Sequence, residues 1–215
     1  TKTRSISIRC LRSRKTTVPD LIANAKKRGI TTVWASQELP ARPPMLPNYG
    51  AVKTWNFDRA TLESIRPGMP YLPGSAEFAA DLAELQRVNV SQTRAQAAIA
   101  NYWADGPGSY TPPGHWHRYA CQAGVSAKYS EVRMARMLAY VGTTLMDAGI
   151  ACWETKYFYY SPRPQQFGLK TSVGLPNFPG YTSGHSTFSF AAATVLASLF
   201  PDRANTFLAN AQQAS

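Results

Sequence analysis

Residues 130–164 read SEVRMARMLAYVGTTLMDAGIACWETKYFYYSPRP, and they predict the longest helix of the chain. Ser130 is a typical N-cap, because its hydroxyl can accept a hydrogen bond from a first-turn N–H group. We predict a helix from there to about residue 148, continued or restarted over 151–160, until two prolines stop it. The apolar residues at helical spacing, mostly on one side, are Val132, Met134, Leu138, Val141 and Leu145.

Outside this stretch the helical signals continue, and no segment shows the alternation typical of a strand. Ser75 and Ser91 are suited to cap two helices. The Gly-Pro-Gly and Pro-Pro-Gly segments around 106–114 should break the chain. The further predicted helices cover about 76–88, 92–104, a stretch from near His115, 184–198, and a last one from Pro201. We therefore predict an all-α fold, a helical bundle.

Composition divides the chain into three segments. Residues 1–36 form a basic arm whose structure we do not predict. Residues 37–74 hold seven prolines and few glycine turns, which favours an extended surface wrap. Residues 75–215 form the helical domain, which carries the two motifs described below.

The chain of 215 residues is 44% hydrophobic and 16% charged, as in an ordinary globular protein. Its formal net charge is +11, but nine Lys and Arg residues fall within residues 1–30, where Asp20 is the single acid. Such an arm is more often a solvated tail than a nucleic-acid ligand, so we expect no nucleic-acid partner. The longest apolar run, 188–200, is too short to span a membrane, and no signal peptide is visible.

The segment KYFYYSPRP, residues 156–164, places Lys156 and Arg163 seven residues apart where the predicted helix ends. Seven residues are close to two helical turns, so both side chains can lie on one side. A guanidinium offers a planar fork of donors and an ammonium a compact charge, a combination suited to clamp an oxyanion. By spacing alone, two cations that simply solvate a helix end are the more common case.

The segment FPGYTSGHS, residues 178–186, places a glycine-rich turn at the start of an apolar helix. First-turn N–H groups of a helix are unpaired and carry the positive end of its dipole, which favours anion binding. Ser183 adds a hydroxyl donor, Gly184 allows close approach to the backbone, and His185 can transfer protons near neutral pH. The alternative is an ordinary serine-capped helix with a surface histidine.

Together, Lys-x6-Arg-Pro followed by Ser-Gly-His resembles the first two signature motifs of a known superfamily. This superfamily joins the vanadium-dependent haloperoxidases and the type 2 phosphatidic acid phosphatases. The likeness covers about residues 46–214 and includes WADGPG from Trp103 and PGHW up to Trp116, as in bacterial haloperoxidase-type members. It implies a helical bundle of the haloperoxidase and acid phosphatase type. Residues 1–36 resemble nothing in the family.

The resemblance also implies a role for each motif residue. Lys156, Arg163, Ser183 and the N–H group of Gly184 would bind the equatorial oxygens of vanadate or phosphate. His185 would be the acid–base group near the apical oxygen. These five residues are the candidate cofactor-binding set, with His185 and Lys156 as the candidate catalytic residues.

Two aromatic residues, Trp153 and Phe178, match positions near the halide site of chloroperoxidases of the family. A dry aromatic wall favours halide chemistry, although core packing beside a site explains both residues equally well. His115 and His117 lie two residues apart, on different faces of a helix, so we expect no shared metal site there.

The family's third motif, Ser-Arg-x5-His, is absent from the 215 residues, because no Arg stands six residues before any of the three histidines. In relatives its His is the axial vanadium ligand of haloperoxidases and the nucleophile of phosphatases. We therefore assign no direct metal ligand, and expect the axial His beyond Ser215 or on a complementing chain. The 215-residue chain by itself is expected to be a C-terminally incomplete domain without turnover.

Three functions stay open at this point. The resemblance favours a vanadate-dependent haloperoxidase, which oxidises halide with hydrogen peroxide and acts on a small organic molecule. Lys156 would polarise the peroxide and His185 would transfer protons. The same pocket could serve an acid phosphatase, with phosphate as substrate or inhibitor, or a non-catalytic anion-binding relative. Relatives are commonly exported, which implies a secreted or periplasmic location, and the chain could form a homo-oligomer.

Overall fold

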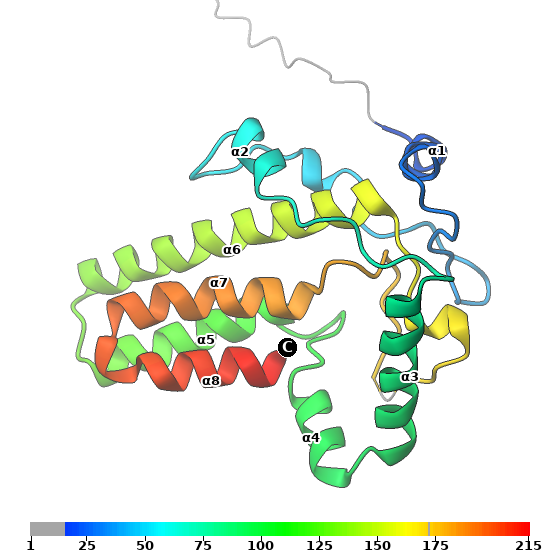
Figure 1. The fold of residues 1–215 in the computed structure, drawn as a ribbon. Helices are drawn as coiled ribbons and strands as arrows, with labels where there is room; N and C mark the ends of the chain where they lie inside the picture. The colour runs from blue at the N-terminus through cyan, green and yellow to red at the C-terminus, as the bar shows by residue number, and fades with distance from the viewer. Residues whose placement is uncertain (1–15, 172) are drawn as a thin grey trace, which may run out of the picture.

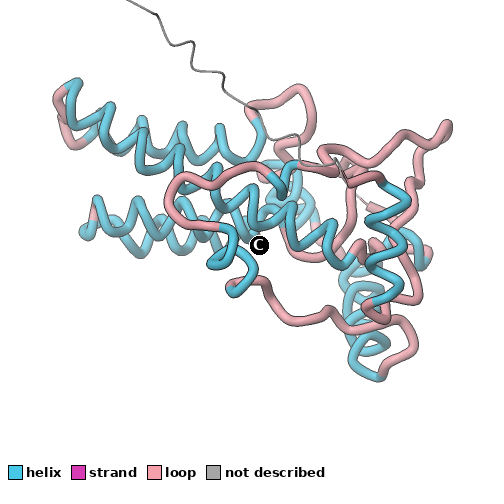
Figure 2. Tube along the Cα trace, turned by 90° about the horizontal axis from the view of Figure 1, so that it is seen from above, coloured by secondary structure: helices cyan, strands magenta, loops and turns pink. Residues whose placement is uncertain are grey.

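The computed structural model describes residues 16–171 and 173–215, and this part of the chain consists of helices and loops without a strand (Figures 1 and 2). The predicted all-α fold is confirmed. None of the described helices has the length and hydrophobicity that a bilayer span requires. The helices are α1 (Val18–Lys27), α2 (Arg59–Ser64), α3 (Ala76–Ser91), α4 (Arg94–Tyr102), α5 (Thr111–Ser126), α6 (Glu131–Tyr159), α7 (Gly184–Leu199) and α8 (Ala204–Ala214).

Helices α5, α6, α7 and α8 pack side by side as a bundle (Figure 1). Its core includes Met137 and Val141 of α6, Leu196 of α7 and Phe207 of α8, each at most 2% exposed. Burial of one such side chain contributes about 1.5–3 kcal/mol to folding. The small side chains of Ala192 and Ala193 are fully buried, which allows α7 to pack closely against its neighbours.

Helix α6 is continuous for 29 residues, so the segment predicted as a continuation or a restart is a continuation. The side chain of Ser130 accepts a hydrogen bond from the N–H group of Arg133, as a cap should. Val132 does not share the buried side that we expected for it, because it is 77% exposed. It lies two residues, or about 200°, from Met134 around the helix.

Two helix starts differ from the sequence prediction. Helix α4 is capped by Thr93 rather than Ser91, because Thr93 and Gln96 form a reciprocal capping box and α3 extends to Ser91. Helix α5 begins at Thr111 rather than near His115. Its two prolines fall in the first turn, where a missing N–H group costs nothing.

The described part of the basic arm is folded, and residues 1–15 lie outside the described residues. Helix α1 begins at a Thr17–Asp20 capping box. Ala25 and Ile30 are buried, and the N–H group of Trp34 donates to the carbonyl of Tyr160 at 2.9 Å. The segment that follows α1 is thus attached to the end of α6.

Residues 37–74 are mostly irregular and run along α6, with a 3-10 turn at Tyr49–Ala51 and the short helix α2. Two buried carboxylates of α6 hold this segment. Asp147 accepts hydrogen bonds from the N–H groups of Trp55 and Asn56 at 2.7 and 2.9 Å and from the side chain of Asn56. Glu154 binds two arginines, described next.

Arg66 donates twice to Glu154, at 2.9 and 2.6 Å, and Arg59 donates once at 3.2 Å. Gly50 lies directly against the α6 backbone, because a Cβ atom there would be 2.4 Å from the Cα of Glu154. We call this contact between residues 50–66 and α6 the wrap seam. It is formed by Gly50, Trp55, Asn56, Arg59, Arg66, Asp147 and Glu154.

Candidate functional site

Lys156, in the last turn of α6, is buried with 1% of its surface exposed. Its ammonium donates to the carbonyl of Pro179 at 3.1 Å, to that of Gly180 at 2.8 Å, and to that of Thr182. These carbonyls belong to residues 178–183, which we call the motif loop. The first motif therefore lies directly on the loop that carries the second motif.

Arg163 contacts the same loop from beyond the end of α6. Its Nε donates to the carbonyl of Phe178 at 2.6 Å. Within the described residues, its two terminal amino groups have no hydrogen-bond acceptor. The ring of Phe178 lies close to both cations, with its centroid 4.7 Å from the guanidinium carbon of Arg163 and 5.1 Å from the Nζ of Lys156.

Lys156 is buried and Arg163 is partly buried, and neither has a counter-charge in the described part of the chain. Among the described residues no carboxylate lies within ion-pair distance of either one. Burial lowers the pKa of Lys156 to about 8 and that of Arg163 to about 10. Arg163 adds to the decrease in the pKa of Lys156, while the nearby Cys152 opposes it. Carbonyl dipoles alone compensate this charge in part, and an anion would complete the compensation.

Helix α7 begins at the end of the motif loop. Ser183 is its N-cap and accepts a hydrogen bond from the N–H group of Ser186 at 3.2 Å, which leaves its own hydroxyl proton free to be donated. In the described part of the chain, the N–H groups of Gly184 and His185 have no acceptor. A Cβ atom at Gly184 would meet nothing within 4 Å, so the space beside this residue is open.

His185 is held through one ring nitrogen. Its Nε2 lies 2.6 Å from the backbone carbonyl of Trp103, and a carbonyl can only accept, so we assign the proton to Nε2. Nδ1 is then the atom available for proton transfer. Trp103 is itself fixed, since its ring stacks on His115 at 4.6 Å and its Nε1 donates to Gln213.

The other two histidines have separate environments. His115 is fully buried, and its Nδ1 lies 2.9 Å from a carboxylate oxygen of Asp105. His117 is half-buried, and burial lowers its pKa. Within residues 16–171 and 173–215, no group of three metal-ligating side chains lies together.

Trp153 and Phe178 lie beside each other, with ring centroids 5.0 Å apart. Trp153 also packs against Tyr49 and Phe188, which agrees with core packing. Its indole N–H group, however, is buried without an acceptor in the described residues. A buried donor without a partner costs about 1–3 kcal/mol, and an anion or a water molecule would relieve that cost.

These features fit an oxyanion such as vanadate or phosphate. Arg163, the Ser183 hydroxyl and the Gly184 N–H group are donors that would bind the oxygens of such an anion directly. Lys156 differs from the expected direct ligand, because its three protons already bind the motif loop. In this geometry it would act on a bound anion through its charge.

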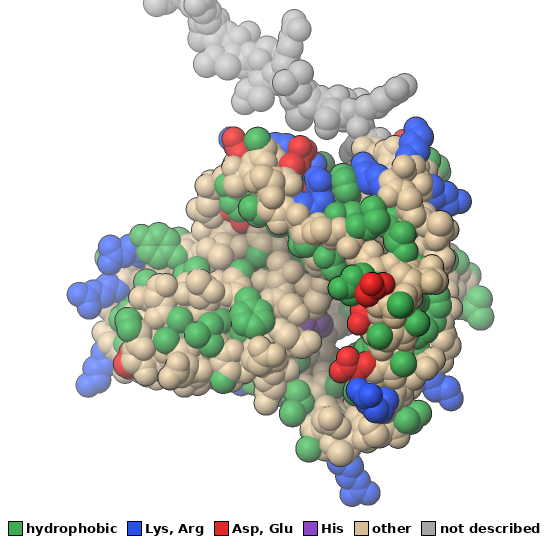
Figure 3. Space-filling model, in the orientation of Figure 1, with side chains coloured by type: hydrophobic (Ala, Val, Ile, Leu, Met, Phe, Trp, Pro, Cys, Tyr) green, Lys and Arg blue, Asp and Glu red, His purple; other side chains and the backbone are tan. Residues whose placement is uncertain are grey.

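Sequence reasoning identified the motif side chains but missed the backbone partners that hold them. The carbonyls of the motif loop and of Trp103 have no side-chain signature. The segment WADGPG, noted for its resemblance, was the one available signal for Trp103. A cavity of about 480 Å³ beside Arg163 was also missed; it is lined by neither Lys156 nor the first turn of α7. Figure 3 shows a hollow between the bundle and α3, with a histidine side chain at its floor.

No protein-family model matches the sequence, and no curated protein matches it. A solved structure described as the first bacterial vanadium-dependent iodoperoxidase is similar to this chain, with a TM-score of 0.73 and 22% sequence identity. The match covers 88% of this chain and 55% of that one, so the chain spans about half the length of that structure. This likeness shows that the chain has the all-α fold of a vanadium-dependent haloperoxidase.

Proposed function

We propose that the protein is a vanadate-dependent haloperoxidase, with its oxyanion site at the motif loop and the first turn of α7. The observation that carries this proposal is the pair of cations, buried Lys156 and partly buried Arg163, which face no carboxylate among the described residues. The fold that the chain shares with a vanadium-dependent iodoperoxidase supports the same function. The overall reaction would be halide, hydrogen peroxide and one proton giving hypohalous acid and water.

Bound vanadate would supply Lewis acidity toward peroxide without a change in its oxidation state. Arg163, Ser183 and Gly184 hold the anion by donating hydrogen bonds, and Lys156 stabilises its negative charge from within the loop. His185 takes or gives the proton at Nδ1, because Nε2 is committed to the carbonyl of Trp103. None of the 215 residues is assigned as the direct ligand of the vanadium.

The N–H group of Trp153, which has no acceptor in the described part of the chain, favours halide chemistry over phosphate-ester hydrolysis. A buried indole donor beside an aromatic ring suits a small, weakly hydrated anion, whereas the leaving group of a phosphate ester needs a wider polar opening. Phe178 completes that side of the site.

The test is peroxide-dependent bromination of a phenolic dye by the full-length protein, with and without orthovanadate, alongside hydrolysis of 4-nitrophenyl phosphate. We expect vanadate-dependent bromination that His185→Ala lowers by about 100-fold, the usual scale of general acid–base catalysis. The control Arg59→Met removes a cation from the wrap seam and should keep the activity. Phosphate release that vanadate inhibits, without bromination, would make the protein a phosphatase.

A further inference from the structure

The carbonyl group that binds His185 belongs to Trp103, the C-cap residue of α4. This oxygen lies 2.6 Å from Nε2 of His185. A carbonyl holds an imidazole in one tautomer only while it stays in place, because a hydrogen bond weakens steeply with distance and angle. The contacts that fix Trp103 therefore also control which ring nitrogen of His185 carries the proton.

His115 of α5 fixes the segment 103–105 at two points. Its ring stacks on that of Trp103, with centroids 4.6 Å apart and ring planes 25° from parallel. Its Nδ1 lies 2.9 Å from Oδ2 of Asp105, and a carboxylate only accepts, so Nδ1 is the donor. Contacts with two residues of one short segment resist both its translation and its rotation. The Trp103 carbonyl lies between these two points.

The bond between His115 and Asp105 is buried. His115 is 0% exposed, and the side chain of Asp105 is 5% exposed. Burial of an imidazole and a carboxylate costs more free energy than burial of apolar residues of similar size, so packing alone does not explain the pair. Asp105 also has a positive φ of 41°, which few residues other than glycine, asparagine and aspartate adopt readily. A polar pair that specifies the position of this turn accounts for both observations.

The next residue of α5 connects this arrangement back to α7. Trp116 is fully buried, and its Nε1 donates to the hydroxyl of Ser189 at 2.9 Å. Ser189 lies four residues after His185, about one turn further along the same side of α7. The contacts form a closed ring that runs from His185 through Trp103, Asp105, His115, Trp116 and Ser189 back to α7.

We propose that His115 is a positioning residue for His185: by its two contacts with residues 103–105, it holds the Trp103 carbonyl that keeps the His185 proton on Nε2. Nδ1 of His185 then keeps its lone pair and can accept a proton from peroxide. The catalytic consequence rests on the proposed haloperoxidase function, whereas the tautomer is a property of the fold.

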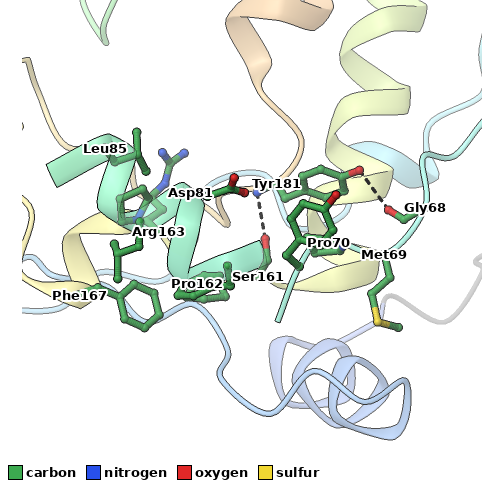
Figure 4. Close-up of a pocket in the computed structure, with 14 residues that line it drawn as sticks. Gly68, Met69, Pro70, Asp81, Leu85, Ser161, Pro162, Arg163, Phe167 and Tyr181 are labelled. Carbon is green, nitrogen blue, oxygen red and sulfur yellow. Dashed lines mark hydrogen bonds between the residues drawn. The ribbon is translucent and has the colours of Figure 1, made fainter. Parts of the chain in front are cut away.

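His115 should act on proton transfer and not on anion binding. Trp103, Asp105 and His115 do not line the cavity beside Arg163 (Figure 4). Among the described residues, no hydrogen bond joins these three side chains to Lys156, Arg163 or the motif loop. A substitution at His115 should therefore slow the reaction and leave the affinity for an anion unchanged. This pattern separates a positioning role from a general loss of structure.

The test is the proton–nitrogen NMR spectrum of the full-length protein with isotope-labelled histidine, at a pH where the rings are neutral. In the wild type we expect an Nε2 proton of His185 that exchanges slowly with water, assigned by its absence in His185→Asn. His115→Phe keeps a ring beside Trp103 and removes the donor to Asp105. It should speed this exchange at least about tenfold and give nitrogen shifts that average the two tautomers.

His117→Gln is the matched control, because His117 lies on the same helix and its ring faces Gly142 of α6. Its exchange rate should stay within about twofold of the wild type. If His115→Phe does not fold, Asp105→Asn replaces it. That variant keeps the shape of the side chain and removes its charge, so the His185 proton should exchange about threefold faster or more.

The second measurement is bromination. In His115→Phe, kcat should fall at least about tenfold while the affinity for orthovanadate stays within about twofold, because a displacement of about 1 Å at a reacting group can cost about 100-fold in rate. The His117→Gln control should keep both values.

Slow exchange and a single tautomer of His185 in His115→Phe, or in Asp105→Asn where the first variant does not fold, would overturn the inference. A loss of orthovanadate affinity equal to the loss in kcat would also overturn it, since both would then reflect a damaged fold. Failure of the proposed function is a different result: the His185 proton would respond to His115→Phe, and neither the wild type nor any variant would brominate the dye.

Discussion

Two buried charged regions lie along α6, and they are compensated in opposite ways. In the wrap seam, Glu154 is paired with Arg66 and Arg59, and Asp147 with backbone and amide N–H groups. At the candidate site, Lys156 has carbonyl partners alone, and no described carboxylate pairs with it.

This difference separates a structural function from a binding function. A buried charge whose partners are all present contributes to the fold and has nothing left to bind. A buried charge without a counter-ion is costly unless another species supplies one. The seam therefore holds the N-terminal segment on the bundle, and the site at the motif loop is left with a net positive charge for an anion.

The largest loss of stability is expected from a substitution in the wrap seam. Glu154→Ala should lower the free energy of unfolding by about 3–5 kcal/mol, because it leaves the mostly buried Arg66 without its counter-charge and removes one of the two carboxylate partners of Arg59. Urea unfolding followed by circular dichroism measures it. The control Glu63→Ala removes a half-exposed partner of Arg59 and should cost less than about 1 kcal/mol. A similar cost for both variants would contradict the structural assignment of the seam.

Substitution of one glycine in each region should separate the effect on stability from the effect on anion binding. Gly50→Ala would force a Cβ atom to 2.4 Å from the Cα of Glu154, so we expect a loss of about 1–3 kcal/mol in stability and no change in anion affinity. Gly184→Ala meets open space, so stability should be kept while the new methyl group weakens anion binding at the start of α7.

Thermal unfolding and calorimetric titration with orthovanadate measure these two effects. Gly68→Ala is the control, since its Cβ atom would also meet nothing within 4 Å and it lies outside both the seam and the motif loop. If Gly184→Ala bound orthovanadate as tightly as the wild type, the open space would not be the anion's position.

A change of pH is expected to have a smaller effect on the affinity for an anion. The pKa of Lys156 is lowered to about 8 by burial, and a bound anion would raise it again. Anion binding therefore takes up a proton above pH 8: affinity should be flat below that value and fall about tenfold per pH unit above it. Sulfate is the ligand to titrate, because its own charge is constant there. Lys156→Met should remove this pH dependence, and an equal slope in that variant would assign the proton to another group.

Most of the fold could be predicted, because hydroxyl caps and apolar periodicity are local signals. Ser75 and Ser130 both cap the helices expected of them. The start of α5 was misplaced because prolines that break a helix interior are harmless in its first turn. Helix α1 was missed although local signals for it exist, namely the Thr17–Asp20 capping box and the helical spacing of Val18, Leu21 and Ile22.

The side chains of the candidate site could be predicted from the sequence, but the backbone groups to which they are hydrogen-bonded could not. The spacing of Lys156 and Arg163 alone favours a solvated helix end, and the anion clamp is predicted only from this motif together with Ser-Gly-His at 183–185. Nothing in the sequence indicates that the protons of Lys156 bind the motif loop, or that His185 reaches a carbonyl 82 residues away at Trp103. Backbone acceptors are identical in every residue, so only the fold specifies which one is used.

If Lys156 and Arg163 hold an oxyanion, equilibrium titration of the full-length protein with orthovanadate at neutral pH should detect its binding. Wild type and Arg59→Met, which loses a compensated cation of the seam, should bind with the same affinity. Lys156→Met should bind at least about 100-fold more weakly, equivalent to about 2.7 kcal/mol. Equal affinity in Lys156→Met, or no binding by the wild type, would contradict the account.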